Sequence, residues 1–396
     1  MQVFIPRENA PGERRVAATP ETVKKLRDAG LEVAIEAHAG AQSFYSDAAY
    51  EEAGATVSAN AARAWGSADI LLKVAAPTSE EAGRLKKGAI TISFLQPASQ
   101  TKSVEALARH GVTAFSLELV PRISRAQSMD ALSSQASIAG YKAVLMAAAR
   151  LGKYFPMLMS AAGTIAPARV LVLGAGVAGL QAIATARRLG AVVEAYDVRP
   201  AVKEEVKSLG ANFLELELEA QQGQGGYARE QSDEFLRKQR ELLTDRVAAS
   251  DVVITTAAVP GRRAPVLVTS EMVAGMRPGS VIVDLAAETG GNVEVTRAGE
   301  VADVGGVFVD GTTNIPSTVP VHASQLYARN VANLLLLMVK EGKLEVNLED
   351  EVVKGACVTK DGEVVNENAR KMMESASASP AAAPAASGTR RRKASQ

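Results

Sequence analysis

The chain has 396 residues, of which 47% are hydrophobic and 22% charged, and its 44 basic side chains balance 44 acidic ones. This composition excludes a wholly disordered chain, and the length favours two domains over one. The balanced charge gives no indication of nucleic-acid binding. The single cysteine, Cys357, excludes an internal disulfide and a cysteine-based metal cluster, and we expect no metal site.

The first 120 residues alternate between strand and helix patterns. Thr19 followed by Pro20 is typical of a helix start, because threonine caps the first turn and proline suits the first helical position. Apolar runs typical of strands occupy residues 1–6, 31–37, 68–77, 89–97 and 112–120. This alternation predicts βαβ units and a mostly parallel sheet.

A long Ala-rich stretch separates this region from a second series of strands. Residues 131–159 have a helical pattern that we expect to break near Gly152. Short apolar runs, of the kind found in strands covered on both faces, occupy residues 169–176, 192–197, 212–217, 251–257, 280–286 and 306–311. After Asn314 the pattern is helical again, and we expect this segment to pack on the first domain.

We therefore predict an α/β protein with two Rossmann-like domains, each a mostly parallel sheet flanked by helices, with a cleft between them. Residues 1–132 and 318–374 together form a discontinuous N-terminal domain, and residues 133–317 form the second domain. Residues 375–396 are rich in Ala, Pro and Ser and carry four basic residues near their end. Because they contain so few large apolar side chains, we expect a disordered tail.

The strongest motif follows the first strand of the second series. Gly174, Gly176 and Gly179 form G-x-G-x-x-G between a strand and a helix, and Asp197 closes the next strand. The glycines allow a tight turn, close approach to a pyrophosphate and close helix packing. An aspartate at this position accepts ribose hydroxyls and repels a 2′-phosphate, so the motif predicts NAD(H) rather than NADP(H). Arg199, two residues further on, weakens that preference.

Residues 1–370 resemble the alanine dehydrogenase and transhydrogenase family. The likeness is carried by "GERRVAATPETVKKL", "ADILLKVAAP", "SFLQPAS", the glycine motif, "IVDLAAETGG" and "TTNIPSTVP". In the amino-acid dehydrogenase branch an arginine binds the substrate carboxylate, and Arg15 matches it. The lysine and histidine that serve as acid/base groups in that branch are replaced here by Ala75 and Gln96. An active-site aspartate is replaced by Glu288.

These replacements bear on the reaction. Oxidation of an amine to a keto acid moves protons as well as a hydride, and so requires a general acid/base. Neither Ala75 nor Gln96 titrates, and the histidines of the chain lie elsewhere, at His38, His110 and His322. Hydride transfer between two nicotinamide rings needs only their alignment, so the sequence favours the transhydrogenase branch.

The segment "PRISRAQSMD" at residues 121–130 resembles the Arg-Gln-Asp loop of the NAD(H)-binding component of proton-translocating NAD(P) transhydrogenase. By this likeness Arg122, Gln127, Asp130 and Ser133 are the catalytic positions. Gln127 would reach the NADP(H) that a partner subunit carries, while Arg122 and Asp130 hold the loop and contact the nicotinamide or ribose of NAD. The resemblance thus implies a loop that positions two nucleotides.

A second loop resembles the same branch. "GQGGYARE" at residues 223–230 matches its mobile loop, in which Tyr227 folds over the bound nucleotide. The full set of residues expected to contact NAD(H) is Gly174, Ala175, Gly176, Val177, Gly179, Asp197, Val198, Tyr227 and Ala257.

The resemblance also implies partners and a location. We expect a homodimer in the cytoplasm, peripherally associated with the inner membrane through membrane-embedded transhydrogenase subunits, one of which binds NADP(H). The N-terminus shows no secretory leader. The apolar run at 334–339 is far shorter than the ~20 residues that span a bilayer, and we expect no transmembrane segment of the chain's own.

Other interpretations stay open at this point. The chain is alternatively a soluble, alanine dehydrogenase-like amino-acid dehydrogenase with displaced acid/base groups, or a non-catalytic module that senses NAD. Arg15 is either a substrate ligand or a structural residue, and the charged side chains of 121–130 alternatively form a solvated turn with an internal ion pair.

Overall fold

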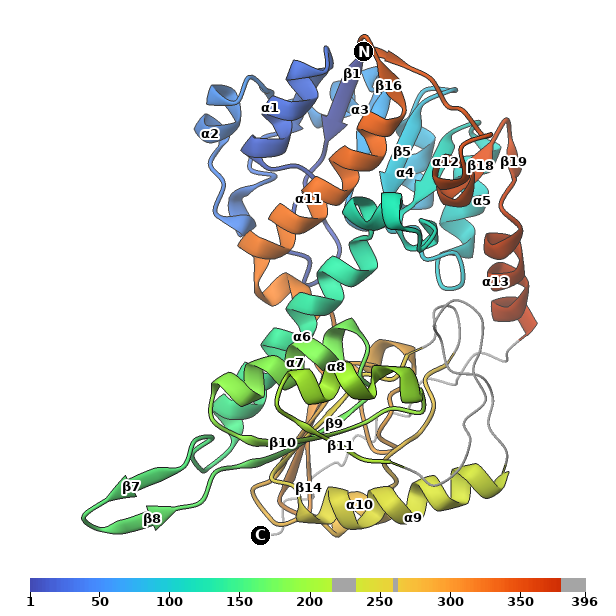
Figure 1. Cartoon of the computed structure of the whole chain (residues 1–396). Coiled ribbons are helices and arrows are strands. Elements are labelled where there is room, and N and C mark those ends of the chain that lie inside the picture. Colours follow the sequence, from blue (N-terminus) through green and yellow to red (C-terminus); the bar gives the residue numbers. More distant parts are fainter. Residues whose placement is uncertain (216–232, 259–262, 379–396) are drawn as a thin grey trace, which may run out of the picture.

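The computed structural model describes residues 1–215, 233–258 and 263–378, and they form two sheets, each flanked by helices (Figure 1). The two sheets are joined by α6 (Ala131–Arg150), and the chain after the second sheet returns to the first. The predicted α/β class with Rossmann-like sheets is confirmed.

The first sheet has the strand order β19-β18-β6-β5-β4-β1-β2-β3. Its strands are β1 (Gln2–Ile5), β2 (Glu32–Glu36), β3 (Thr56–Ser58), β4 (Ile70–Leu72), β5 (Ile90–Ser93), β6 (Thr113–Ser116), β18 (Cys357–Lys360) and β19 (Glu363–Val364). The strands β1 to β6 pair in parallel, whereas β18 and β19 add an antiparallel edge. The apolar runs of the sequence predict five of these strands; β3, β18 and β19 are additional.

Helices from both ends of the chain cover this sheet. They are α1 (Pro20–Asp28), α2 (Asp47–Glu52), α3 (Ala61–Ser67), α4 (Ser79–Arg84), α5 (Thr101–Arg109), α11 (Pro320–Leu337), α12 (Glu351–Ala356) and α13 (Glu367–Ala378). The helix α1 begins after Thr19, as predicted, and the Thr19 N–H donates to Thr22 Oγ1. Tyr327 and Val331 of α11 share one buried core with Ile5, and α11 lies beside α1 (Figure 1).

The second sheet has the order β11-β10-β9-β12-β13-β15-β14. Its strands are β9 (Arg169–Leu173), β10 (Val192–Tyr196), β11 (Asn212–Phe213), β12 (Val252–Thr255), β13 (Val281–Asp284), β14 (Val301–Val304) and β15 (Val307–Asp310). Its helices are α7 (Val177–Arg188), α8 (Lys203–Ser208), α9 (Asp233–Ala249) and α10 (Ser270–Ala274). The strand β14 is antiparallel to β15 and lies outside the apolar runs that predict strands.

Two boundaries differ from the sequence prediction. The helix α6 ends at Arg150, and residues near its predicted end form the hairpin β7 (Leu158–Ser160) and β8 (Gly163–Ile165) instead, because Gly152 and Pro156 interrupt the helix. At the other end α13 continues through residues 375–378, because no helix breaker precedes Pro380. The remainder of the predicted tail lies outside the described residues.

A very close helix contact holds α6 against α7. A Cβ built on Gly140 of α6 would lie 2.0 Å from the carbonyl oxygen of Ala178 in α7, a distance that real Cβ atoms do not show. Only a glycine therefore lets the two helices approach this closely. In the described part of the chain, no helix is both long and apolar enough to cross a membrane.

The substitution Gly140→Ala is expected to lower the free energy of unfolding by about 2–3 kcal/mol, because the two helices must separate to admit the methyl group. Urea denaturation followed by circular dichroism measures the change. Gly66→Ala in α3 is the matched control: its Cβ would meet nothing within 4 Å. Because alanine restricts the unfolded chain, that variant is expected to gain about 0.5–1 kcal/mol. Equal effects of the two variants would contradict the close contact.

Candidate functional site

The ends of four parallel strands define one edge of the second sheet. In the strand register Leu173 of β9 lies opposite Tyr196 of β10 and Thr255 of β12, and Thr255 lies opposite Asp284 of β13. The strand order reverses between β10-β9 and β12-β13, so the crevice of a doubly wound sheet lies at β9 and β12. Residues that follow these strands meet at this edge.

The predicted glycine turn occupies this position. Gly174 has φ +100°, and a Cβ there would lie 2.5 Å from Thr256 Oγ1. A Cβ on Gly179 would lie 1.8 Å from the Gly174 carbonyl oxygen, so this glycine lets α7 pack on the turn. Gly176 precedes the first residue of α7, Val177, and among the described residues no side chain caps this helix. Uncapped N–H groups at a helix start form a site for an anion.

Asp197 accepts hydrogen bonds from its neighbours at the same edge. Its Oδ2 accepts from the Ala175 N–H at 2.7 Å and from Arg199 Nη2 at 2.8 Å. Its Oδ1 accepts from the Arg199 N–H at 2.8 Å and from Arg199 Nε at 2.9 Å. Burial alone would raise the pKa of Asp197, but the Arg199 and Ala175 hydrogen bonds outweigh it and hold the pKa below its ordinary value. Between the two charged residues, Val198 is partly buried against the core.

Two polar residues that the sequence analysis did not single out support this edge. The buried side chain of Asn292 accepts from the Ala257 N–H at 2.9 Å and donates to the Ala257 carbonyl at 2.8 Å, which fixes the backbone of Ala257. The carboxylate of Asp284 is fully buried and accepts from the Asn292 N–H at 2.8 Å, from Thr255 Oγ1 at 2.9 Å and from other donors nearby. A carboxylate that ends a buried strand was the sequence signal for this anchor.

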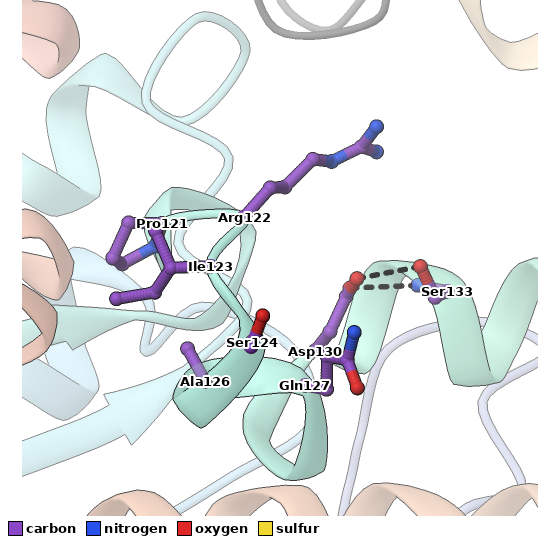
Figure 2. Close-up of a pocket in the computed structure, with 8 residues that line it drawn as sticks. All are labelled: Pro121, Arg122, Ile123, Ser124, Ala126, Gln127, Asp130 and Ser133. Atoms are coloured by element: carbon purple, nitrogen blue, oxygen red, sulfur yellow. Dashed lines mark hydrogen bonds between the residues drawn. The ribbon is translucent and has the colours of Figure 1, made fainter.

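The loop at 121–130 and the start of α6 enclose a small pocket of about 240 Å³ (Figure 2). All four predicted catalytic residues, Arg122, Gln127, Asp130 and Ser133, line it. Asp130 caps α6: its carboxylate accepts from the Ser133 N–H at 2.9 Å and from Ser133 Oγ at 2.5 Å. Figure 2 shows Gln127 next to Asp130, and Arg122 extending away from the loop.

The pocket loop is held from below by the first sheet's helices. Arg125 forms a bidentate ion pair with Asp350, the N-cap of α12, with both N–O distances 2.9 Å. Asn330 and Asn333 of α11 donate to the Ser128 carbonyl at 2.9 and 3.0 Å. Ala126 and Met129 are buried in the core as well. Exposed Gln127 is therefore carried by a loop whose neighbouring residues are fixed.

One helix connects the loop pocket to the glycine turn. Asp130 stands at the N-terminus of α6, and Gly140 of the same helix contacts Ala178 in the first turn of α7. Ten helical residues correspond to about 15 Å along the axis. The pocket and the turn thus lie within the reach of one extended ligand.

Arg15 lies in a buried network where the two sheets meet. Its Nε and Nη2 donate to the Glu13 carboxylate at 2.8 and 2.7 Å, and its Nη1 donates to Gln135 Oε1 at 2.9 Å. Its Nη2 also donates to Asn314 Oδ1 at 3.1 Å. Gln135 belongs to α6 and Asn314 follows β15, so this guanidinium joins the first sheet to the second. The structural interpretation of Arg15 is the one that these contacts favour.

The positions that hold acid/base groups in the amino-acid dehydrogenases have other surroundings here. Gln96 is exposed with φ +46°, and its N–H donates to Glu118 Oε1 at 2.5 Å. Burial raises the pKa of Glu118. Near Ala75 the buried cation is Lys73, which the sequence analysis missed; its Nζ lies 3.1 Å from Glu8 Oε2.

The remaining predicted positions are quickly placed. Glu288 accepts from the Asn314 N–H at 2.5 Å at the junction of the sheets. Tyr227 and its loop at 223–230 lie outside the described residues. Among the residues described, no three His, Cys, Asp or Glu side chains come together to hold a metal ion. Cys357 is buried, and burial raises the pKa of its thiol to about 11.

Comparison with known proteins gives a consistent result. The family model "Alanine dehydrogenase/PNT, N-terminal domain" matches residues 4–139, and the corresponding C-terminal domain model matches residues 143–367. The chain is 50% identical over 376 residues to an NAD(P) transhydrogenase alpha subunit of Rhodospirillum rubrum, covering 92% of this chain and 98% of that protein. It is 35% identical to alanine dehydrogenase of Mycobacterium tuberculosis, with 75% of each chain covered. The crystal structure of a transhydrogenase from Sinorhizobium meliloti superposes with a TM-score of 0.82 and 46% identity, over 93% of this chain and all of that one.

The substitution Arg15→Ala is expected to lower the free energy of unfolding by about 3–5 kcal/mol, because it leaves the buried Glu13 carboxylate without its cation. Chemical denaturation at neutral pH measures the loss. Arg7→Ala is the control: that arginine is 54% exposed and lies 4.0 Å from Glu36, so its loss is expected to cost less than about 1 kcal/mol. Equal losses would show that the buried network contributes nothing special.

The wild type and Arg15→Ala also have an expected difference in pH dependence. Burial alone would raise the pKa of Glu13, but the bonds from Arg15 outweigh it and hold the pKa below its ordinary value. The stability that this pair contributes is therefore fully present above the unfolded glutamate pKa of about 4.3. It is lost as the pH falls through the folded pKa, so wild type and Arg15→Ala are expected to converge in acid. A difference that stays constant down to about pH 3 would contradict this assignment.

Proposed function

Because the chain belongs to the alanine dehydrogenase/PNT family, we propose that it is the NAD(H)-binding component of an NAD(P) transhydrogenase. The observation that carries the proposal is a pocket built for positioning, next to a dinucleotide-type turn, at a site where the dehydrogenase acid/base residues are absent. The reaction that we assign is direct hydride transfer between NAD(H) on this chain and NADP(H) on a partner subunit.

The residues at the sheet edge fit a dinucleotide. A Cβ added to Gly176 would meet only the Arg199 side chain, at 3.9 Å, so this face of the turn has room for a pyrophosphate against the start of α7. Asp197 would hold the adenosine ribose, with Ala175, Val177, Val198 and Ala257 lining the same edge. The nicotinamide end would then extend along α6, about 15 Å, to the loop pocket.

Transfer at the loop pocket requires alignment and not proton transfer. NAD(H), when bound, supplies the hydride chemistry at its nicotinamide ring. Asp130 is held by Ser133 and orients the start of α6, while Arg122 and Gln127 stand at the pocket. Gln127 is exposed on an anchored loop, which suits contact with a nucleotide that another subunit brings. Tyr227 would close over the NAD(H) from its own loop.

An amino-acid dehydrogenase is disfavoured by two observations. The Arg15 guanidinium that would bind a substrate carboxylate is occupied by Glu13, Gln135 and Asn314. Ala75 stands where that branch needs a titrating lysine. A module that only senses NAD shares the nucleotide site, and the transfer assay below separates it from a transhydrogenase component.

The proposal includes an assembly. The partners are membrane-embedded transhydrogenase subunits, among them the NADP(H)-binding component, and the whole complex couples the transfer to proton translocation. This chain would associate peripherally with the cytoplasmic side of the inner membrane through those subunits, as a homodimer. The hairpin β7–β8, which projects from the body in Figure 1, supports a contact between two copies, since Met157 and Met159 are 58% and 72% exposed.

The substitution Gln127→Asn is expected to slow hydride transfer at least about 100-fold while the Kd for NADH changes less than about threefold, because the shortened amide no longer reaches the partner's nucleotide. The assay mixes the chain with an NADP(H)-binding transhydrogenase component and follows reduction of an NAD analogue by NADPH. Ser128→Ala, on the same loop, serves as control and is expected to retain transfer. NADH binding by the wild type without any transfer would refute the transhydrogenase assignment. Collapse of NADH binding in Gln127→Asn would refute the role of this glutamine.

The substitution Met159→Glu is expected to convert the dimer to monomers, because a charge on the hairpin must be desolvated at the contact. Light scattering coupled to size-exclusion chromatography measures the mass. Val266→Glu, which changes an equally apolar residue that is 46% exposed elsewhere, is expected to remain dimeric. A monomeric wild type, or a dimeric Met159→Glu, would count against this contact.

A further inference from the structure

The Asp197 carboxylate is already engaged before any nucleotide is considered. Besides the Ala175 N–H, three donors of Arg199 bind it: the backbone N–H, Nε and Nη2, at 2.8, 2.9 and 2.8 Å. Asp197 is 6% exposed and Arg199 26%, so the ion pair is largely shielded from water. Two bonds to a guanidinium at these distances are charge-assisted and hold both groups in one geometry.

The geometry of the chain keeps the guanidinium at this place. Arg199 precedes Pro200, and it has the extended conformation, φ −92° and ψ 111°, that a following proline favours. Its Nη2 lies 3.9 Å from where a Cβ on Gly176 would stand. The positive charge is therefore next to both the ribose-binding carboxylate and the glycine turn.

This placement has opposite consequences for two nucleotides. A ribose diol that donates to Asp197 must replace the bonds from Arg199 Nε and Nη2, because those bonds occupy the carboxylate oxygens. A 2′-phosphate is repelled by a bare carboxylate but attracted by a neighbouring guanidinium. The arginine thus competes with one nucleotide and favours the other.

We propose that Arg199 is a specificity-determining residue: by pairing with Asp197 it reduces the preference of this site for NAD(H) over the 2′-phosphorylated nucleotide. The inference rests on the proposed function, since it takes the edge at Gly174–Gly179 to be a nucleotide site. It assigns to one side chain the degree to which the two nucleotide pools are kept apart on this chain.

The test compares Arg199→Gln with wild type in titrations with NADH, NADPH and reduced nicotinamide mononucleotide, which lacks the adenosine ribose. NADH is expected to bind about threefold or more tightly and NADPH more weakly, so the Kd ratio changes about tenfold or more in favour of NADH. The mononucleotide, which does not reach Asp197, is expected to change less than about twofold. Thermal melting verifies that the variant is folded.

Three controls make the result specific. Arg199→Lys keeps a charge and is expected to shift the ratio less than Arg199→Gln does. Lys203→Gln removes a cation four residues away, which pairs with Glu215 at 2.5 Å, and is expected to leave the ratio unchanged. In an Asp197→Asn background, the effect of Arg199→Gln on NADH binding is expected to disappear.

The outcomes separate the two levels of the argument. An unchanged ratio in folded Arg199→Gln, or an equal shift for the mononucleotide, would overturn the role of Arg199 while leaving the proposed function intact. A wild type that binds neither NADH nor NADPH would overturn the proposed function and this inference together.

Discussion

The buried pairing of Arg15 with Glu13 is the interaction on which the arrangement of the two sheets depends. Both side chains are nearly inaccessible, and burying two charges is costly unless hydrogen bonds satisfy them. Here the bonds come from both sides of the junction: from Gln135 in α6 and from Asn314 after β15. Asn314 adopts φ +48°, and its N–H donates to Glu288. Satisfying this one ion pair therefore sets how the loop pocket of the first sheet faces the glycine turn of the second.

Local pattern accounts for the central strands and not for the edges of the sheets. The runs that became β9, β12 and β13 are apolar along their length because both faces of these strands are covered. In contrast, β14 alternates exposed and half-buried residues, and only Gly305-Gly306, a two-residue turn, marked it as half of a hairpin. The antiparallel partner of β6 is β18, which lies far along the chain, and no local pattern specifies such a pairing.

The candidate site divides in the same way. The glycine motif, Asp197 and the residues of 121–130 were recognisable because their spacing or their likeness to a family carries the information. What the sequence left open was the pairing of polar groups: that Arg199 takes up Asp197, that Asn292 holds Ala257, and that Arg125 is committed to Asp350. Each of these pairs joins groups of ordinary composition, and only the three-dimensional arrangement decides which donor meets which acceptor.

The contact between Gly140 and Ala178 makes α6 a mechanical link. A helix in a packed environment is stiff along its axis, and here its side has no slack against α7, because backbone meets backbone without an intervening side chain. A small displacement of α7 when the glycine turn is filled would be passed along α6 as a rigid-body shift. It would arrive at Asp130, and hence at the pocket where Gln127 stands, with little loss. Occupancy at one end of the molecule would then be felt at the other without any rearrangement of the intervening fold.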